Sequence, residues 1–382
     1  MKLYRMPLLI KRIIIEELGF DERLFLSFTS KRTCGLLGLL KNDLKGISIT
    51  INIDNSEITV CVQKPSHRWS EQYSVFNICS YFGYNCNFNI PYEQRYGMGS
   101  SARTIGDSTV QPVLYPSTIY CDLNDKRVGR YTASNLVIVF GNLLRHLNKF
   151  LNIENCLLCE FDKTIPVGLI HQLDCTYSYE RIYVRDTNVM DVSPKDLTFL
   201  LENIKASQLS LNVKVLSVPG YKYQKSPEKN RSIDWLKIYG YSWVDFSELP
   251  AARLLTFVEK IQPDQMNMML KSWVAGRNRD MEIGDFEFER LTDLNCEAIF
   301  NGITRHETQL TKAEIGKFIE FVNGEKFVNI AVDILRESDG IRVTVIGAWT
   351  GPMSRYYINE TQKMYVMVWS DSNLRAIGRT NQ

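Results

Sequence analysis

The sequence predicts a mixed α/β protein in which a short helical module precedes a much larger strand–helix domain. Apolar residues recur at helical spacing over residues 7–40. Strict alternation of apolar and polar residues begins near Ile47, and from residue 193 onward helix and strand patterns follow each other at intervals of about 25 residues. We therefore assign residues 1–45 to the helical module and residues 46–382 to the large domain.

The composition is that of an ordinary globular protein. Hydrophobic residues make up 45% of the 382 residues and charged residues 23%, which argues against long disorder. The formal charge is +2 and the basic residues are dispersed, so we expect no nucleic-acid partner. Lys11 and Arg12 interrupt the N-terminal apolar stretch, and no apolar run approaches the roughly 18 residues of a membrane helix. We expect no membrane partner and a soluble, intracellular protein, cytoplasmic and/or nuclear.

The nine cysteines are an odd number scattered along the chain, which indicates reduced thiols rather than a disulfide framework. Cys156 and Cys159 form a C-x-x-C, but no second pair follows at zinc-finger spacing. Leu157 and Leu158 between them favour a buried strand. We expect neither a metal nor a cofactor.

Three short helices account for the N-terminal module. Pro7 suits the start of the first helix and Gly19 its end. Asp21 can cap a second helix, and Ser30 a third. Helices this short need to pack on each other or on a partner.

The first half of the large domain contains recognisable strands and one long helix. Ile47–Ile53 and Ile58–Val62 alternate as strands, residues 133–153 have helical period, and Cys156–Phe161 is typical of a short buried strand. The stretch from Asn77 to Arg103 is rich in Tyr, Asn, Gly and Ser and predicts loops.

The second half repeats a strand–helix unit. Ser193 and Pro194 open a helix through about Ala206, and Leu209–Val218 follows as a strand. The unit returns as the strand Arg253–Lys260, the helix Gln262–Val274 with Gly276 past its end, and the strand Met281–Phe288. This alternation predicts a parallel sheet with helices on one side, in the manner of a degenerate leucine-rich-repeat solenoid.

The C-terminal region, residues 325–350, predicts a hairpin. Apolar and polar residues alternate from Phe327 to Ile334 and again from Ile341, and Ser338-Asp339-Gly340 between the two runs is a strong turn signal. We expect a last strand at Tyr365–Trp369.

The N-terminal module resembles the F-box. The segment from Met6-Pro7-Leu8-Leu9 through Ser30-Lys31-Arg32 follows the F-box register without gaps: a proline after an apolar residue, Ile14 seven positions on, Leu18 ending the first helix, and a basic pair closing the pattern. It departs from the commonest form at Arg23, where an apolar residue is usual, and at Thr33, where a tryptophan is usual.

Two further segments are similar to the type-2 F-box-associated domain of nematode F-box proteins. Residues 265–276 match its "lN-x-x-L-K-x-W-x-x-G" core, which places that core at residues 205–290, and Val332–Gly340 is similar to its "DI-x-R-x-DG" segment. Leu270 and Trp273 lie three apart on one helical face, so we interpret them as core residues rather than contacts.

The resemblance implies an adaptor without catalytic residues. The F-box binds a Skp1-type linker protein and, through it, a cullin, while the C-terminal domain holds an unknown substrate protein for ubiquitination. By this resemblance, the linker-binding residues are Pro7, Leu8, Ile14, Leu18, Leu26 and Phe28. The short helices that carry them expose more apolar surface than they can bury among themselves, and that surface packs either on a partner or on the downstream domain.

Two alternatives remain open. Gly97–Ala102 is similar to the phosphate loop of small-molecule kinases, although no sustained helix follows it. A protein-interaction scaffold without a ligase connection would also explain Arg23 and Thr33. The four histidines show no metal-ligand spacing, and carboxylates such as Asp162 and Asp174 form no recognisable catalytic pair.

Overall fold

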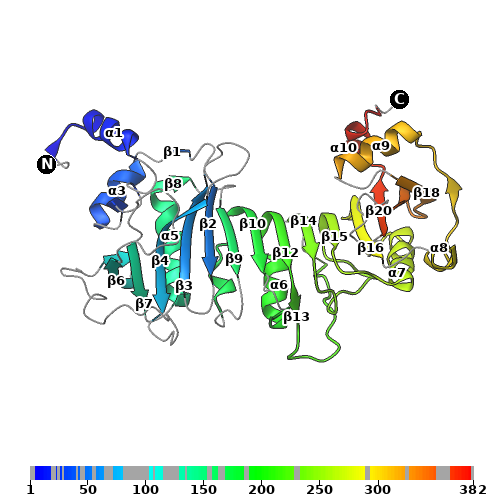
Figure 1. Ribbon diagram of the computed structural model, residues 1–382, viewed down its shortest axis with the longest axis horizontal. Helices are drawn as coiled ribbons and strands as arrows, with labels where there is room; N and C mark the ends of the chain where they lie inside the picture. The colour runs from blue at the N-terminus through cyan, green and yellow to red at the C-terminus, as the bar shows by residue number, and fades with distance from the viewer. Residues whose placement is uncertain are drawn as a thin grey trace, which may run out of the picture. The chain divides into compact units, whose positions relative to one another are not determined.

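The structure is a computed structural model of residues 1–382 that describes only part of the chain. The described residues are 5–18, 23, 26–27, 30–39, 42–43, 48–53, 57–63, 72–80, 103–105, 108–114, 129–133, 136–152, 157–161, 168–184, 189–227, 233–288, 293–322, 327–349 and 362–379. The chain is mixed α/β, as predicted, and divides into unit 1, Met1–Asp186, and unit 2, Thr187–Gln382 (Figure 1). The boundary at residue 45 that we expected from the sequence lies inside unit 1.

The N-terminal helices of unit 1 follow the predicted pattern. Helix α1 spans Leu8–Glu17 with Pro7 at its N-cap, and α3 spans Lys31–Leu39. Ser30 caps α3, because the Thr33 N–H donates to Ser30 Oγ at 3.0 Å. Between the two helices, the described residues Arg23, Leu26 and Ser27 are helical.

The sheet of unit 1 combines parallel and antiparallel pairs. Strands β10, β9 and β2 are parallel, β2, β3 and β4 form an antiparallel run, β7 is parallel to β4, and β6 and β5 follow antiparallel. The strands are β2 (Ser48–Ile53), β3 (Glu57–Gln63), β4 (Gln72–Ser80), β5 (Arg103–Ile105), β6 (Ser108–Leu114), β7 (Gly129–Ala133), β9 (Leu157–Phe161) and β10 (Ser178–Val184). Two short strands, β1 (Asn42–Asp43) and β8 (Leu151–Asn152), pair separately. Of the expected loop region, Asn77–Ser80 belongs to β4, and most of the rest lies outside the described residues.

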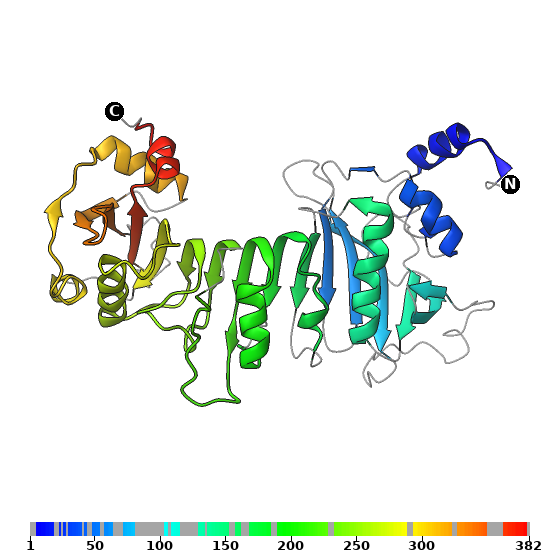
Figure 2. The same cartoon turned by 180° about the vertical axis from the view of Figure 1, so that it is seen from behind.

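The core of unit 1 lies between this sheet and helix α5 (Leu136–Phe150), which packs on β3 and β4 (Figure 2). The isoleucines 49, 51 and 53 of β2 are fully buried, as the alternation predicted. Phe140 of α5 meets Phe161 of β9 edge to face, with ring centroids 6.0 Å apart. A short 3-10 helix, η2 (Ile170–Gln172), also contacts α5.

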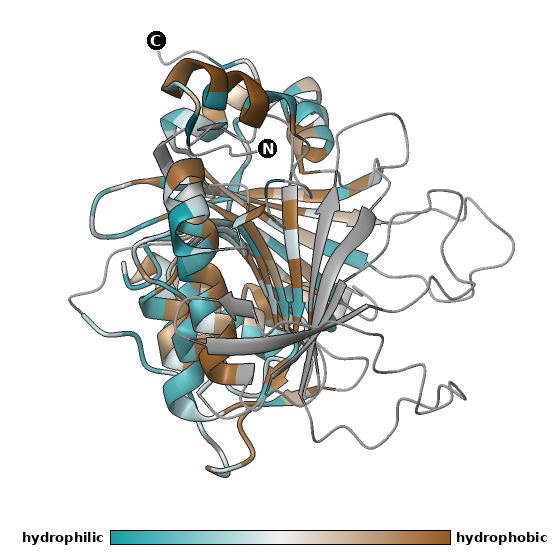
Figure 3. Ribbon diagram, turned by 90° about the vertical axis from the view of Figure 1, so that its left-hand side faces the viewer, coloured by the Kyte–Doolittle hydropathy of each residue, from teal (hydrophilic) through white to brown (hydrophobic). Residues whose placement is uncertain are grey.

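Unit 2 begins with parallel strands. Strands β12 (Lys205–Leu211), β14 (Ile233–Ile238), β15 (Ala252–Phe257) and β16 (Ile283–Phe288) pair in this order. We expected one strand at Leu209–Val218. The structure has two in its place: β12, which starts four residues earlier, and β13 (Val213–Lys214), which pairs with β11 (Met190–Asp191). In Figure 3 apolar and polar bands alternate along strands and helices, as expected of elements that bury one face.

The helices of unit 2 start where capping residues predicted. Helix α6 spans Pro194–Glu202, and Ser193 forms a capping box with Asp196. Helix α7 spans Pro263–Val274 and ends before Gly276, whose φ of +81° is the left-handed conformation that glycine adopts readily.

An antiparallel region completes unit 2. Strand β16 pairs with β20 (Gln362–Val368), β20 with β19 (Arg342–Trp349), β19 with β18 (Phe327–Leu335), and β18 with β17 (His306–Glu307). The β18–β19 hairpin and the last strand confirm two predictions. Helices α8 (Asp293–Ile299), α9 (Lys312–Phe321) and α10 (Asp371–Ala376) were not predicted; Phe318 and Ile319 of α9 join a core with Ile346 and Tyr365.

Candidate functional site

Helix α1 carries apolar side chains that remain exposed among the residues that the structure describes. Leu8 is 59% exposed, Leu9 68%, Ile10 42% and Ile13 49%, whereas Ile15 is 1% exposed. Apolar side chains in this number are normally buried, and an exposed cluster of them marks a contact surface. We call Leu9, Ile10 and Ile13 the α1 face; Leu8 is exposed in the first turn but lies seven positions from Ile15, on the other side of the helix.

Helical geometry explains why these residues act together. Leu9 and Ile13 are four positions apart and Ile10 and Ile13 three apart, so their side chains neighbour one another along one side of the helix. Ile15 projects to the opposite side, where it is buried. The helix therefore uses one side to join unit 1 and leaves the other side open.

The residues that the F-box resemblance singles out fall on both sides. Pro7 and Leu8 are exposed, while Ile14, Leu18 and Leu26 are half-buried, and Phe28 lies outside the described residues. The structure adds Leu9, Ile10 and Ile13, which that set omits. The helical spacing of Leu9 and Ile13 was the signal that could have identified them.

Arg23 stabilises the end of α1. Its Nε donates to the carbonyl oxygen of Leu18 at 2.9 Å and its Nη2 to that of Glu16 at 3.0 Å. The last carbonyls of a helix lack intrahelical partners, so a cationic donor there is favourable. This role accounts physically for an arginine where the F-box pattern has an apolar residue.

Helix α3 and Ser27 of the N-terminal module pack on α5. Ser27 Oγ lies 2.8 Å from His146 Nε2, and Cys34 Sγ lies 4.0 Å from His146 Nδ1. Burial, together with the charge of Lys149, lowers the pKa of His146 to about 4. A Cβ on Gly38 of α3 would lie 2.5 Å from the Lys149 carbonyl oxygen, so this glycine allows the close approach of the two helices.

Thr33 belongs to the same packed region. It is 4% exposed, and its hydroxyl lies 2.8 Å from Ser30 Oγ. Within the described residues, α3 therefore buries the side that includes Thr33, whereas the α1 face stays exposed.

In unit 2, the two segments that are similar to the F-box-associated domain meet in space. The Arg336 guanidinium lies 5.0 Å from the centre of the Trp273 ring, and the Glu337 N–H donates to the Val274 carbonyl at 3.1 Å. Trp273 and Leu270 are each 1% exposed, which confirms that they are core residues. These contacts join α7 to the β18–β19 hairpin and are structural.

The residues of the enzymatic alternatives do not assemble into a site within the described part of the chain. Gly97–Ala102, Cys156 and Asp162 lie outside it, while Cys159 is fully buried and Asp174 is engaged locally with Thr176. Over the described residues, no group of three or more His, Cys, Asp or Glu side chains could hold a metal ion. No described helix has the length and apolar composition to cross a membrane.

Comparisons of the chain with protein-family models, with curated proteins and with solved structures each find no match. The functional assignment therefore depends on the α1 face and on the sequence resemblance.

Proposed function

We propose that this chain is the substrate-recognition adaptor of an SCF-type (Skp1-cullin-F-box) ubiquitin ligase. The α1 face binds a Skp1-type linker protein, the linker binds a cullin, and the large domain holds a target protein. The adaptor does no chemistry itself. It raises the effective concentration of the target's lysines at the ubiquitin-transfer site.

The exposure of the α1 face is the observation that supports this proposal most strongly. An isolated ten-residue helix is marginally stable in water, and helix-in-groove recognition uses apolar residues at i, i+3 and i+4. Leu9, Ile10 and Ile13 have this spacing and exposure. Pro7 is the N-cap residue, and its ring fixes φ near −55° directly before the first helical residue, Leu8.

The solenoid form of the parallel sheet in unit 2 is part of the same proposal. We infer that the parallel strands of unit 2 form a degenerate leucine-rich-repeat-like solenoid that presents the target-binding surface. In support, β12, β14, β15 and β16 are consecutive parallel neighbours that start at residues 205, 233, 252 and 283. The unequal intervals explain why no regular leucine pattern is visible.

Co-expression of the full chain with a Skp1-type protein tests the proposal. We expect a stable complex by pull-down and calorimetry, and we expect Leu9→Asp with Ile13→Asp to weaken it by about 100-fold or more, since two buried apolar contacts are lost. Met268→Asp is the matched control, because Met268 is 47% exposed on α7.

A chain that is folded but does not bind the Skp1-type protein would contradict the adaptor role. That result would favour the interaction-scaffold alternative, which keeps the helical shape without the ligase connection.

A further inference from the structure

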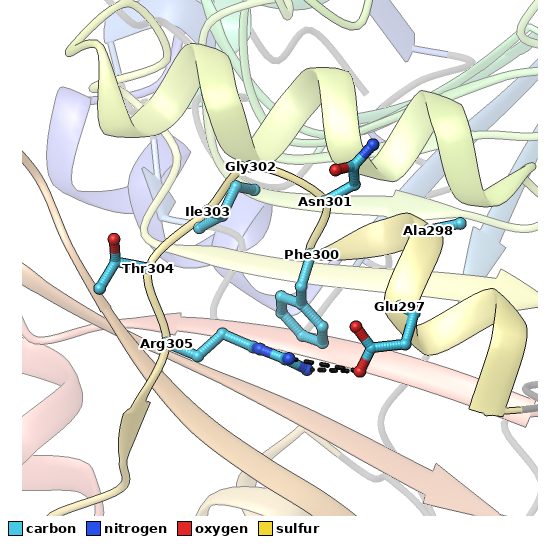
Figure 4. A pocket seen from close by; sticks show the side chains of 8 residues that line it. All are labelled: Glu297, Ala298, Phe300, Asn301, Gly302, Ile303, Thr304 and Arg305. Carbon is cyan, nitrogen blue, oxygen red and sulfur yellow. Dashed lines mark hydrogen bonds and ion pairs between the residues drawn. The ribbon is translucent and has the colours of Figure 1, made fainter.

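A cavity of about 790 Å³ lies in unit 2 where α8 ends (Figure 4). It is formed within residues 297–305, and Asn301, Gly302 and Thr304 in its lining are exposed to solvent. One segment of the chain lines this cavity, which is wide open to solvent, so an anionic group can reach it together with the residues that flank that group in a peptide.

Arg305 lies at one wall of this cavity, where it contacts Phe300 and Glu297. Its guanidinium lies 5.4 Å from the centre of the Phe300 ring, and both Nη1 and Nη2 donate to Glu297 Oε1, at 3.2 and 3.3 Å. Figure 4 shows the two side chains joined beside the Phe300 ring. The Phe300 ring face stays beside the guanidinium when the carboxylate partner is exchanged for another anion, so the ring keeps Arg305 in place.

The Glu297 carboxylate is a weak competitor for that guanidinium. Its side chain is 70% exposed, and exposed ion pairs contribute about 1 kcal/mol or less. An incoming anionic group can therefore replace or share this partner of Arg305.

The carbonyl oxygens of Ile299, Phe300 and Asn301, in the turn that lines the cavity, each accept a hydrogen bond. Asn267 of α7 donates from Nδ2 to the carbonyls of Ile299 and Asn301, at 2.8 and 2.9 Å. The Ile303 N–H donates to the Phe300 carbonyl at 2.9 Å. These bonds fix the turn and occupy acceptors that would otherwise repel an anion.

A second cation lies beside the turn. Lys271 of α7 is exposed, and its Cε and Nζ are 3.4 Å from where a Cβ on Gly302 would stand. Gly302 has a φ of +71°, so it permits both the turn and the approach of this lysine. With Arg305 and Lys271 against Glu297, the site has a net positive charge.

We propose that this cavity binds an anionic side chain, a carboxylate or a phosphate, within a peptide segment of the target protein. The proposal rests on the adaptor function and assigns its target-binding domain a recognition site. Arg305 pairs with the anionic group through its planar donors, Lys271 adds a second charge, and the cavity accommodates neighbouring peptide residues.

Fluorescence anisotropy of labelled hexapeptides with the full chain tests this site. The peptides carry two central glutamates, two phosphoserines or two glutamines in otherwise identical sequences. We expect the glutamate or phosphoserine peptide to bind and the glutamine peptide not to bind. Tighter binding of phosphoserine identifies a phosphorylated target segment, and equal or tighter binding of glutamate identifies an acidic one.

Variants separate a binding role from a structural one. Lys271→Gln with Arg305→Gln should weaken binding by about tenfold or more, the effect of losing charged hydrogen bonds. Glu297→Gln should strengthen binding, because the competing carboxylate is gone. Lys195→Gln, which changes an exposed lysine on α6, is the control and should have no effect.

Equal binding of all three peptides, no binding at millimolar concentration, or insensitivity to Lys271→Gln with Arg305→Gln would overturn the proposal. The outcome is independent of the linker experiment, since the peptide assay uses the chain alone. Peptide failure with retained linker binding refutes only the cavity, and the reverse result refutes only the adaptor role.

Discussion

Helices α1 and α7 have similar lengths and are both rich in apolar residues, yet they relate to their surroundings in opposite ways. In α7, Met266, Met269, Leu270 and Trp273 are buried, whereas in α1 only Ile15 is. At the start of α7 the Gln262 N–H donates to Gln265 Oε1 at 2.8 Å, whereas Pro7 at the start of α1 has no N–H to donate. Apolar content therefore does not decide whether a helix is completed within its own chain. The distribution of contacts does: most apolar side chains of α7 are buried, while Leu9, Ile10 and Ile13 of α1 are exposed, which is why we propose α1 as the docking helix.

The largest expected loss of stability comes from a substitution in the buried side of α7. Trp273→Ala should destabilise unit 2 by about 3 to 5 kcal/mol, because it removes a buried ring and the contact with Arg336. Urea denaturation followed by circular dichroism measures the change. Met268→Ala on the exposed side of α7 should change stability by about 0.5 kcal/mol or less. Equal effects would show that α7 is not the core helix described.

The next effect concerns the attachment of the N-terminal helices to α5. The pKa of His146 is lowered from 6.5 to about 4, mainly by burial, so the folded protein favours neutral His146. The free energy of unfolding is not reduced by His146 above about pH 6.5, where the imidazole is neutral in both states. As the pH falls from about 6.5 to 4, the unfolded chain binds the proton first, so the free energy of unfolding decreases. The loss is on the order of 2 to 3 kcal/mol.

Urea denaturation at several pH values measures that dependence. His146→Gln, which keeps a polar side chain but does not titrate, should flatten the curve over the same range. An unchanged slope in the variant would assign the dependence to other groups.

A smaller loss of stability is expected at the C-terminal end of α1. Arg23→Ala should weaken the C-terminal end of the helix by about 1 kcal/mol, because two hydrogen bonds to its carbonyls disappear. Faster amide hydrogen exchange at the end of α1, with α7 unaffected, is the expected observation. Exchange that stays at the wild-type rate would mean that Arg23 does not support the helix.

Elements with strong local signals could be predicted from the sequence. Ser193-Pro194 and Pro263 with Gly276 placed α6 and α7, and Asp339-Gly340 placed the β18–β19 hairpin, because capping and turn chemistry involve only neighbouring residues. Helices α9 and α10 also begin at local caps, the Thr311–Glu314 capping box and Ser370, so they were predictable although not predicted. Strand β14 depends on pairing with β12 and β15, which no local pattern encodes.

The candidate sites were only partly predictable for the same reason. The register located the helical module, but exposure of Leu9, Ile10 and Ile13 depends on what the downstream domain covers. Arg23 was recognised as unusual, yet its acceptors became identifiable only once the backbone was placed. The cavity is lined by the end of α8 and the turn after it, and Asn267 and Lys271 of α7 lie beside that turn, a juxtaposition that no local pattern encodes.

The most direct test of the account is amide hydrogen exchange of the full chain with and without a Skp1-type protein. We predict strong protection of residues 8–17 in the complex, because the partner covers the α1 face, and no change in α7, which is already completed by its own chain. Unchanged exchange in α1 at saturating partner, or protection confined to α7, would contradict the claim that α1 is the docking helix.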